Sequence, residues 1–314
     1  MSQSFAFVFP GQGSQRVGML ADFALQHALI RQTFDEASAG CGLDLWTLSQ
    51  DGPDTELNRT EVTQPALLAA SVALWRLWTT RSGAKPSLLA GHSLGEYSAL
   101  VAAEALSLAD AAKLVRDRGR LMQEAVPAGT GGMAAVLMAD DALIAEACRD
   151  AAQGDVVQPA NFNAPGQTVI SGSAAAVERA MALLTERGVK KIVKLAVSVP
   201  SHSLLMKPAA EALAPTLRGL NWQLPTIPVV QNADARAHNS LDAIQDALIR
   251  QLYAPVRWTE CVQQIAGQGV SRFAECGPEK VLTGLFKRID KSLEARALSV
   301  LADFETCFNE WSAA

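Results

Sequence analysis

The 314-residue sequence has no apolar stretch long enough to cross a membrane and no long run of basic residues. A membrane-spanning helix needs about 20 mostly apolar residues, so we expect no membrane partner. Nucleic-acid binding depends on phosphate neutralisation by clustered Lys and Arg, and the formal net charge is −5, so we expect no nucleic-acid partner. The start, MSQSFAFVFPGQG, has no basic segment before the apolar run 5–9, which predicts no secretory signal.

Cysteine is scarce and widely spaced. No two cysteines, and no cysteine and histidine, have the close spacing of metal ligands or of a redox motif. An odd number of distant cysteines is typical of reduced thiols in a cytoplasmic protein, so we expect no metal site and a cytoplasmic location. The five residues are Cys41, Cys148, Cys261, Cys276 and Cys307.

Short apolar runs alternate with helical segments along most of the chain. Hydrophobic residues make up 49% of the sequence and charged residues 19%, as in an ordinary globular protein. Strand-helix alternation predicts an α/β fold with a mostly parallel sheet. We expect strands at 5–9, 87–90, 227–232, 271–276 and 297–300, and helices at 66–80, 94–105, 107–124, about 202–218, about 240–252 and about 257–268.

The middle of the chain has a different pattern. Strands are predicted at 132–139, 156–163, 167–172 and 190–197, and helices at 141–152 and 173–187. The order β-α-β-β-α-β is that of a ferredoxin-like unit. The predicted fold is therefore an α/β-hydrolase-like large domain, residues 1–129 and 198–314, with a small ferredoxin-like domain inserted at 130–197.

The stretch Gly91-His92-Ser93-Leu94-Gly95 fits the pattern G-x-S-x-G. A strand precedes it and a helix follows, as in a nucleophile elbow, where the serine oxygen is exposed at a sharp turn. Ser93 would then lie at a helix N-terminus, where the backbone N–H of Leu94 is placed to stabilise an oxyanion. The alternative is a serine that serves only the geometry of a glycine-rich turn.

A nucleophilic serine needs a base, and the sequence contains four histidines. His202, in SVPSHSLL, follows a strand and begins a helix, the position at which α/β proteins place functional groups. His92 adjoins the serine but would point away from it, and His27 lies in a helix. His238, in the polar loop NADARAHNS, remains an alternative. No acidic residue lies close before His202, and the sequence pattern leaves open which group orients it.

Further motifs occur in a fixed order from about residue 4 to about residue 300. They are FPGQGSQ (9–15), TQPAL (63–67), GHSLGE (91–96), VRDRGRLMQEA (115–125), VPSHS (199–203) and QLYAPVRW (251–258). Together they resemble the malonyl-CoA:acyl carrier protein transacylases of fatty acid synthesis and the acyltransferase domains of fatty acid and polyketide synthases. The stand-alone length is similar to that of the discrete bacterial type.

The resemblance implies roles for the matching residues. Ser93 matches the acylated nucleophile and His202 its base. Gln12 matches the residue whose backbone N–H joins that of Leu94 in the oxyanion hole. Gln251 matches a glutamine whose backbone carbonyl accepts a hydrogen bond from the histidine, so the family needs no acid there.

Arg118 matches the arginine that binds the malonyl carboxylate. A guanidinium can make two parallel charge-assisted hydrogen bonds to a carboxylate, which suits this role. Spacing alone favours another interpretation, in which Arg118 lies on the helix surface and pairs with Asp117 or Glu124. The family resemblance singles out Arg118.

Four more polar residues are weaker candidates for substrate contacts. Gln64 would border the pocket, and Ser201 would shape the acyl site next to the base. Asn161 and Asn163 could contact the pantetheine arm or the phosphates from the small domain. Alternatively, the two asparagines belong to a turn before Pro165.

The resemblance implies malonyl-CoA and acyl carrier protein as partners and no metal or organic cofactor. Basic segments at 186–194 and 286–291 are candidate contacts for the acidic carrier. A serine esterase or thioesterase is the second hypothesis, for which Asp234 and His238 would supply the late acid and base. A non-catalytic binding module is the third. Selectivity among malonyl, methylmalonyl and acetyl groups, the pathway that the carrier serves and the oligomeric state are left open.

Overall fold

A computed structural model describes residues 4–81, 84–197 and 199–312. Its larger sheet has the strand order β10-β9-β1-β2-β7-β8, with β8 antiparallel to β7 and all other neighbours parallel. This confirms the predicted α/β class. The strands are β1 (Phe5–Phe9), β2 (Leu88–Gly91), β7 (Val229–Gln231), β8 (Arg236–Ala237), β9 (Arg272–Glu275) and β10 (Glu294–Ala297).

Strand β1 lies in the middle of this sheet, and its side chains alternate between two hydrophobic cores. Phe5, Phe7 and Phe9 face the first core, in which the ring of Phe7 meets Trp78 edge to face at a centroid distance of 5.1 Å. Ala6 and Val8 face the second core on the other side. Burial on both faces explains why the strand has a continuous apolar sequence.

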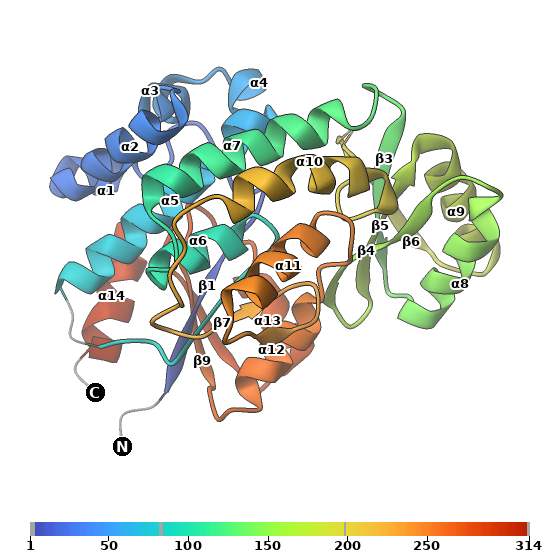
Figure 1. Cartoon of the computed structure of the whole chain (residues 1–314). Coiled ribbons are helices and arrows are strands. Elements are labelled where there is room, and N and C mark those ends of the chain that lie inside the picture. Colours follow the sequence, from blue (N-terminus) through green and yellow to red (C-terminus); the bar gives the residue numbers. More distant parts are fainter. Residues whose placement is uncertain (1–3, 82–83, 198, 313–314) are drawn as a thin grey trace.

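Helices cover both faces of the large sheet (Figure 1). The side of the first core includes α1 (Ala21–Gln26), α2 (Ala28–Cys41), α3 (Leu45–Asp51), α4 (Asp54–Leu57), α5 (Thr60–Arg81), α6 (Gly95–Ala102), α7 (Leu108–Glu124), the 3₁₀ turn η1 (Leu204–Met206), α10 (Lys207–Arg218), α11 (Leu241–Gln251) and α14 (Leu301–Ser312). The other side is covered by α12 (Trp258–Ala266) and α13 (Thr283–Ile289).

The smaller sheet is built from one continuous segment, with the order β4-β5-β3-β6 and antiparallel neighbours. Two helices pack on one of its faces, and Figure 1 shows this unit beside the larger one. The order confirms the ferredoxin-like prediction. The elements are β3 (Gly131–Leu137), α8 (Asp141–Ala152), β4 (Val157–Ala164), β5 (Gln167–Ser173), α9 (Ala174–Glu186) and β6 (Lys191–Lys194).

The division of the chain at 129/130 and 197/198 stays a prediction, and Ser198 lies outside the described residues. The free face of the small sheet presents Met133, Ala160 and Val169, an apolar cluster separate from the one under its helices. Met133 and Val169 line the pocket described below, so this face forms a wall of the candidate site.

Several predicted elements have wrong bounds; the strand predicted at 190–197 covers only 191–194, and the helix predicted at about 202–218 begins at Lys207. The last strand runs over 294–297 rather than 297–300, because an edge strand carries charged residues such as Glu294 and Arg296 and escapes an apolar pattern. The helix expected at 66–80 begins at Thr60 and contains Pro65. Strand β8, with two exposed residues, has no sequence signal.

Candidate active site

Ser93 lies at a sharp turn between β2 and α6 with a positive φ of 52°. A Cβ on Gly91 would lie 1.9 Å from the carbonyl carbon of Gly95, and a Cβ on Gly95 would lie 2.0 Å from the carbonyl oxygen of Phe9. Such distances exclude any side chain at the two glycines. The turn therefore brings backbone against backbone and leaves the Ser93 side chain at the head of the helix, as a nucleophile elbow requires.

His202 is brought to this turn from a loop before η1. Its Nε2 lies 2.8 Å from the Oγ of Ser93, and its Nδ1 lies 2.7 Å from the backbone carbonyl oxygen of Gln251. Because a carbonyl can only accept, Nδ1 carries the proton and Nε2 is free to accept the serine hydroxyl. The backbone N–H of His202 donates to the carbonyl of Leu252 at 3.0 Å, which holds a residue with a positive φ of 60° in place.

The pKa of His202 is lowered to about 3, first by burial and then by the positive charge of Arg118, while the Gln251 carbonyl acts in the opposite direction. The imidazole is therefore neutral near pH 7 and can accept a proton. The predicted base and serine lie within hydrogen-bond distance, and the group that meets the second nitrogen is a backbone carbonyl.

Arg118, on α7, is 1% exposed. Its Nη1 donates to Oε1 of Gln64 at 2.8 Å, and its Nη2 to Oε1 of Gln251 at 3.0 Å and to Oγ of Ser93 at 3.3 Å. These acceptors are uncharged, and no carboxylate contacts Arg118 within the described part of the chain. The pKa of Arg118 is lowered by burial. The guanidinium is thus a buried cation without a direct counterion, beside the nucleophile.

The alternative placement of Arg118 on the helix surface is wrong. Its neighbour Arg120 makes those contacts instead, to Asp117 at 3.6 Å and to Glu124 at 2.9 Å. Helical periodicity explains the difference, since positions separated by two residues lie on nearly opposite sides of a helix. Gln64 lies behind the guanidinium, 1% exposed, and is not among the residues of the pocket wall.

The proposed oxyanion donors both lie on the pocket wall. Gln12 follows β1, and Leu94 follows the serine at the start of α6. Among the residues that the structure describes, neither backbone N–H has a hydrogen-bond acceptor. Two unpaired N–H groups beside a nucleophile are suited to an oxyanion, which would supply the missing acceptor.

Asn161 and Asn163 lie in β4 and not in a turn, and both line the pocket. Oδ1 of Asn163 lies 2.8 Å from Nε2 of His92, so this histidine faces the small sheet and not the serine. Asn161 is buried and forms a bridge to the backbone of Val256. Ser201 is half-buried on the same wall, directly before His202.

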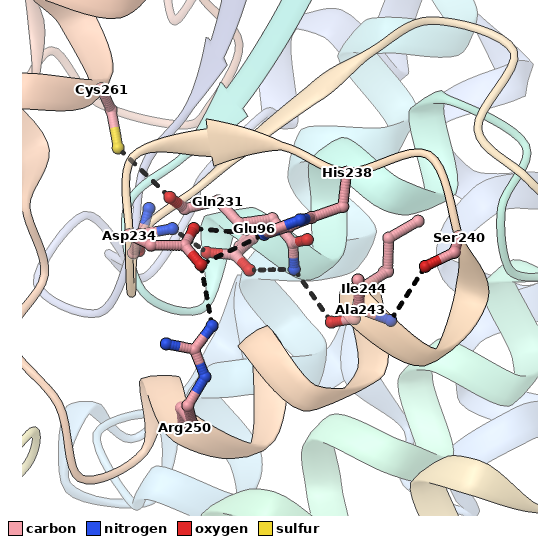
Figure 2. Close-up of polar contacts among 10 residues, drawn as sticks. Glu96, Gln231, Asp234, His238, Ser240, Ala243, Ile244, Arg250 and Cys261 are labelled. Carbon is pink, nitrogen blue, oxygen red and sulfur yellow. Dashed lines mark hydrogen bonds and ion pairs between the residues drawn. The ribbon is translucent and has the colours of Figure 1, made fainter.

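The other two histidines lie away from the serine. Nε2 of His238 lies 3.2 Å from the carboxylate of Asp234, which also accepts from Arg250 at 2.8 Å (Figure 2). In the described structure this group has no contact with Ser93. His27 separates α1 from α2. The alternative that used His238 as the base is therefore wrong on placement.

Sequence reasoning missed two residues beneath the site, Glu96 and Asn232. Oδ1 of Asn232 accepts from the backbone N–H of Ser93 at 2.7 Å, and its Nδ2 donates to the carbonyl of Gly91 at 2.7 Å. The backbone N–H of Asn232 donates to Glu96 at 2.8 Å. Glu96 belongs to the GHSLGE motif, which is a signal for it; Asn232 ends the strand predicted at 227–232, which by itself assigns no role.

The pocket has a volume of about 400 Å³ and lies between the two sheets. One side of the pocket is formed by the elbow, the loop after β1 and His202. The other side is formed by Met133 and Val169 of the small sheet and by Leu195, which follows β6. Its walls are thus partly apolar, with polar groups converging on Ser93, as in many ligand sites.

Three further findings concern the rest of the chain. No described helix is long and apolar enough to cross a membrane. Within the described residues, no group of three or more His, Cys, Asp or Glu side chains is arranged to hold a metal ion, and the five cysteines are unpaired. Of the basic segments, Lys194 pairs with Glu178, and Arg288 donates to Gln167.

Residues 6–303 match the family model of the acyl transferase domain. The malonyl CoA-acyl carrier protein transacylase of Salmonella typhimurium is 58% identical over 295 residues, which cover 94% of this chain and 96% of that protein. The solved malonyl-CoA:acyl carrier protein transacylase of Xanthomonas oryzae pv. oryzae is 63% identical with a TM-score of 0.98, over 99% of this chain and 100% of that one.

A second solved structure is a malonyl-transacylase in complex with its type II PKS acyl-carrier protein. It is 54% identical with a TM-score of 0.97, over 98% of this chain and 100% of that one. The family model, the relatives and the two structures agree over nearly the whole length of the chain. The chain therefore belongs to the acyl transferase domain family and, within it, to the malonyl-CoA:acyl carrier protein transacylases.

Proposed function

We propose that this protein transfers the malonyl group of malonyl-CoA to the phosphopantetheine thiol of acyl carrier protein through an ester on Ser93, and so supplies malonyl groups for fatty acid synthesis. One arrangement carries the proposal: the Ser93 hydroxyl lies 2.8 Å from a neutral histidine and 3.3 Å from a buried arginine that contacts no carboxylate among the described residues. A malonyl thioester has a carboxylate two bonds from its reacting carbonyl, so one substrate can occupy both groups. The relatives' names support the choice of substrate and acceptor.

In the first half-reaction, Nε2 of His202 accepts the proton of Ser93 as its Oγ bonds to the thioester carbonyl carbon. The carbonyl oxygen becomes an oxyanion and accepts from the backbone N–H groups of Gln12 and Leu94. Collapse of this intermediate breaks the carbon–sulfur bond. The sulfur takes the proton from His202, CoA leaves as a thiol, and Ser93 holds malonate as an ester.

In the second half-reaction, the phosphopantetheine thiol of the carrier gives its proton to His202 and attacks the ester carbonyl. The same two N–H groups stabilise the second oxyanion. The carbon–oxygen bond to Ser93 breaks, and Oγ takes the proton back from His202. The cycle leaves the protein unchanged and requires no metal or organic cofactor, because every proton and bond passes through Ser93 and His202.

His202 acts here without a carboxylate partner. Its Nδ1–H donates to the Gln251 carbonyl at 2.7 Å, which fixes the tautomer and the plane of the ring. A substrate carboxylate on Arg118 would neutralise the charge that helps to lower the pKa of His202. Binding of a dicarboxylic acyl group would therefore make this histidine a stronger base than it is in the free protein.

Arg118 is the proposed source of acyl selectivity. Its planar fork can form two parallel hydrogen bonds to a carboxylate, in a pocket where burial makes an unpaired charge costly. An acetyl group would leave the guanidinium with only its neutral acceptors. The apolar face of the small sheet, with Met133 and Val169, would limit the access of water to the ester.

We also propose a cytoplasmic location, where malonyl-CoA and the carrier would meet the enzyme. Five unpaired cysteines, all buried, support a reducing compartment. A candidate docking surface for the carrier is the exposed pair Lys190 and Lys191, where β6 begins. An acidic carrier fits a basic surface, and these two lysines supply one beside the small sheet.

The test is to mix the protein with malonyl-CoA and to measure its mass before and after adding the carrier protein with its phosphopantetheine. We expect one stable malonyl adduct on the peptide containing Ser93, no adduct on Ser93→Ala, and loss of the adduct to the carrier. Rapid release of free malonate without a stable adduct would instead support the thioesterase hypothesis. An adduct that persists on Ser93→Ala would refute the assignment of the nucleophile.

A further inference from the structure

Glu96 is a fully buried carboxylate directly beneath the nucleophile, in the first turn of α6. Its Oε1 accepts from Nε2 of Gln231 at 2.9 Å, and its Oε2 accepts from the backbone N–H of Asn232 at 2.8 Å and from Nε2 of Gln251 at 3.0 Å. Figure 2 shows Glu96 against Gln231, close to the Asp234 cluster. All three partners are donors, which is the arrangement that an ionised carboxylate requires.

Two of these partners reach the reacting groups. Asn232 holds the elbow, because its side chain accepts from the backbone N–H of Ser93 at 2.7 Å. Besides its bond to Glu96, Gln251 makes three contacts: its carbonyl accepts from His202, its Oε1 accepts from Arg118, and its Nε2 donates to the carbonyl of Ser93 at 2.9 Å. One carboxylate therefore fixes the two residues that position the nucleophile, its base and the arginine.

We propose that Glu96 is a positioning residue of the acyl transfer, and that its ionised carboxylate holds Asn232 and Gln251 in the geometry that the reaction needs. The proposal rests on the function proposed above. It differs from a purely structural role in one respect: the state of the site depends on whether Glu96 is ionised. A proton on either oxygen would face an N–H donor and weaken a charge-assisted hydrogen bond.

The surroundings of Glu96 support such a dependence. Burial raises its pKa to about 7, against the lowering effects of the bonds from Asn232, Gln231 and Gln251. One nearby acceptor could take the extra proton, Oε1 of Gln231, which has no partner among the described residues. However, Nε2 of the same Gln231 amide also donates to the carbonyl of Ile244 at 3.0 Å. This bond keeps Nε2, and not Oε1, directed toward Glu96. The other titratable or charged groups that interact with Glu96 are Tyr97, Arg118, Asp234 and Cys261.

Ionisation of Glu96 has opposite effects on stability and on activity. Because its pKa is raised in the folded state, its contribution to stability is fully present below its ordinary pKa of about 4.5 and is lost as the pH rises through about 7. The proposed active form is the ionised one, which predominates above pH 7. As the pH rises through about 7, activity should therefore increase while ionisation of Glu96 lowers the stability of the fold.

The experiment measures the rate of Ser93 malonylation between pH 6 and pH 8 with the malonyl thioester of N-acetylcysteamine, which has no phosphate that titrates in this range. If only the ionised form is active, a pKa of about 7 gives a rate about tenfold lower at pH 6 than at pH 8. The variant Glu96→Gln should be slower at pH 8 and should vary less than about twofold over the range. Its amide oxygen can still accept from Asn232 and Gln251, and its NH₂ can meet Oε1 of Gln231 if that amide rotates.

Glu275→Gln is the matched control, because Glu275 is the other buried glutamate among the described residues and also accepts from three N–H donors, all of them in its case backbone groups. It should keep the pH dependence of the wild type. The melting temperature of Glu96→Gln, relative to the wild type, should increase as the pH rises from 5 to 8. A folded Glu96→Gln that keeps the tenfold fall, or that matches the wild-type rate at every pH, would overturn the proposal.

If Glu96→Gln does not fold, Gln231→Leu provides the second test. It removes one donor to the carboxylate, so the pKa of Glu96 should rise and the fall in rate should move to higher pH. A fall in rate at the wild-type pH would overturn the proposal. Wild-type labelling at pH 8 is measured first: if Ser93 is not labelled, the proposed function fails, and if it is labelled, the variants test Glu96 alone.

Discussion

Two polar clusters in this protein each contain a histidine and an arginine but differ in what surrounds them. In the cluster of Asp234, the carboxylate accepts from both His238 and Arg250 (Figure 2). In the cluster of Ser93, His202 meets a backbone carbonyl and Arg118 meets two glutamine side chains and the serine. The first cluster contains its own anion. In the second, within the described structure, no carboxylate contacts either His202 or Arg118.

The comparison shows that an acid next to a histidine does not by itself mark a catalytic base. Burial acts to raise the pKa of Asp234, but the bonds from Arg250 and His238 outweigh it and leave that pKa lowered. The carboxylate of Asp234 is thus paired with a cation, Arg250, inside its own cluster. In the Ser93 cluster, burial and Arg118 lower the pKa of His202, so the site holds a neutral base and an uncompensated cation. Such a site can accept an anionic substrate; the other cannot.

Replacing each histidine by alanine should give the largest difference between the clusters. His202→Ala removes the group that takes the serine proton, and we expect the rate of Ser93 malonylation to fall by about 10³-fold or more. His238→Ala should change that rate by less than about twofold. The measurement is single-turnover labelling with malonyl-CoA at pH 7.5, with circular dichroism to verify folding. A large loss in His238→Ala alone would reverse the assignment of the base.

Replacing each arginine by alanine tests the second half of the comparison. Arg118→Ala should slow malonyl transfer by on the order of 10²-fold, because a buried charge pair with the substrate carboxylate is lost. Acetyl transfer from acetyl-CoA should fall much less, since acetyl has no carboxylate. Arg250→Ala should leave the ratio of malonyl to acetyl rates unchanged. Equal losses of both rates in Arg118→Ala would show that the arginine does not select the acyl group.

Most of the fold could be predicted from the sequence because the main elements have strong local signals. Buried parallel strands are continuous apolar runs. The helix predicted at 107–124 starts with a serine, a residue type common at N-caps, and Ser107 does accept from the backbone N–H of Asp110 at 3.1 Å at the start of α7. The errors occur where pairing with a distant strand, and not the local sequence, determines the structure. Strand β10 is held by its register with β9, and its ion pairs, such as Glu294 with Arg272, give it a polar sequence.

The site was less accessible to local patterns. The elbow can be recognised in the sequence because its close backbone contacts allow only glycine at positions 91 and 95, which produces the pattern G-x-S-x-G. By contrast, Arg118 shares its helix with other basic residues, and spacing favoured a surface position; only the family resemblance singled it out. Asn232 could not be assigned at all, because its role depends on which backbone N–H its side chain meets across the fold. Long-range contacts of this kind leave no local pattern in one sequence.

The smallest expected effect comes from removing the anion of the Asp234 cluster. Asp234→Asn weakens ion pairs that are partly exposed, so we expect a loss of about 1 kcal/mol or less, roughly 2–4 °C in melting temperature at most, and unchanged malonyl transfer. Because the folded-state pKa of Asp234 is lowered, this stabilisation is present above the ordinary pKa of aspartate and is lost as the pH falls through the folded-state value. Melting curves at pH 5 and pH 4 should show a smaller difference from the wild type at pH 4 than at pH 5. A difference that grows on acidification would mean that Asp234 acts through another group.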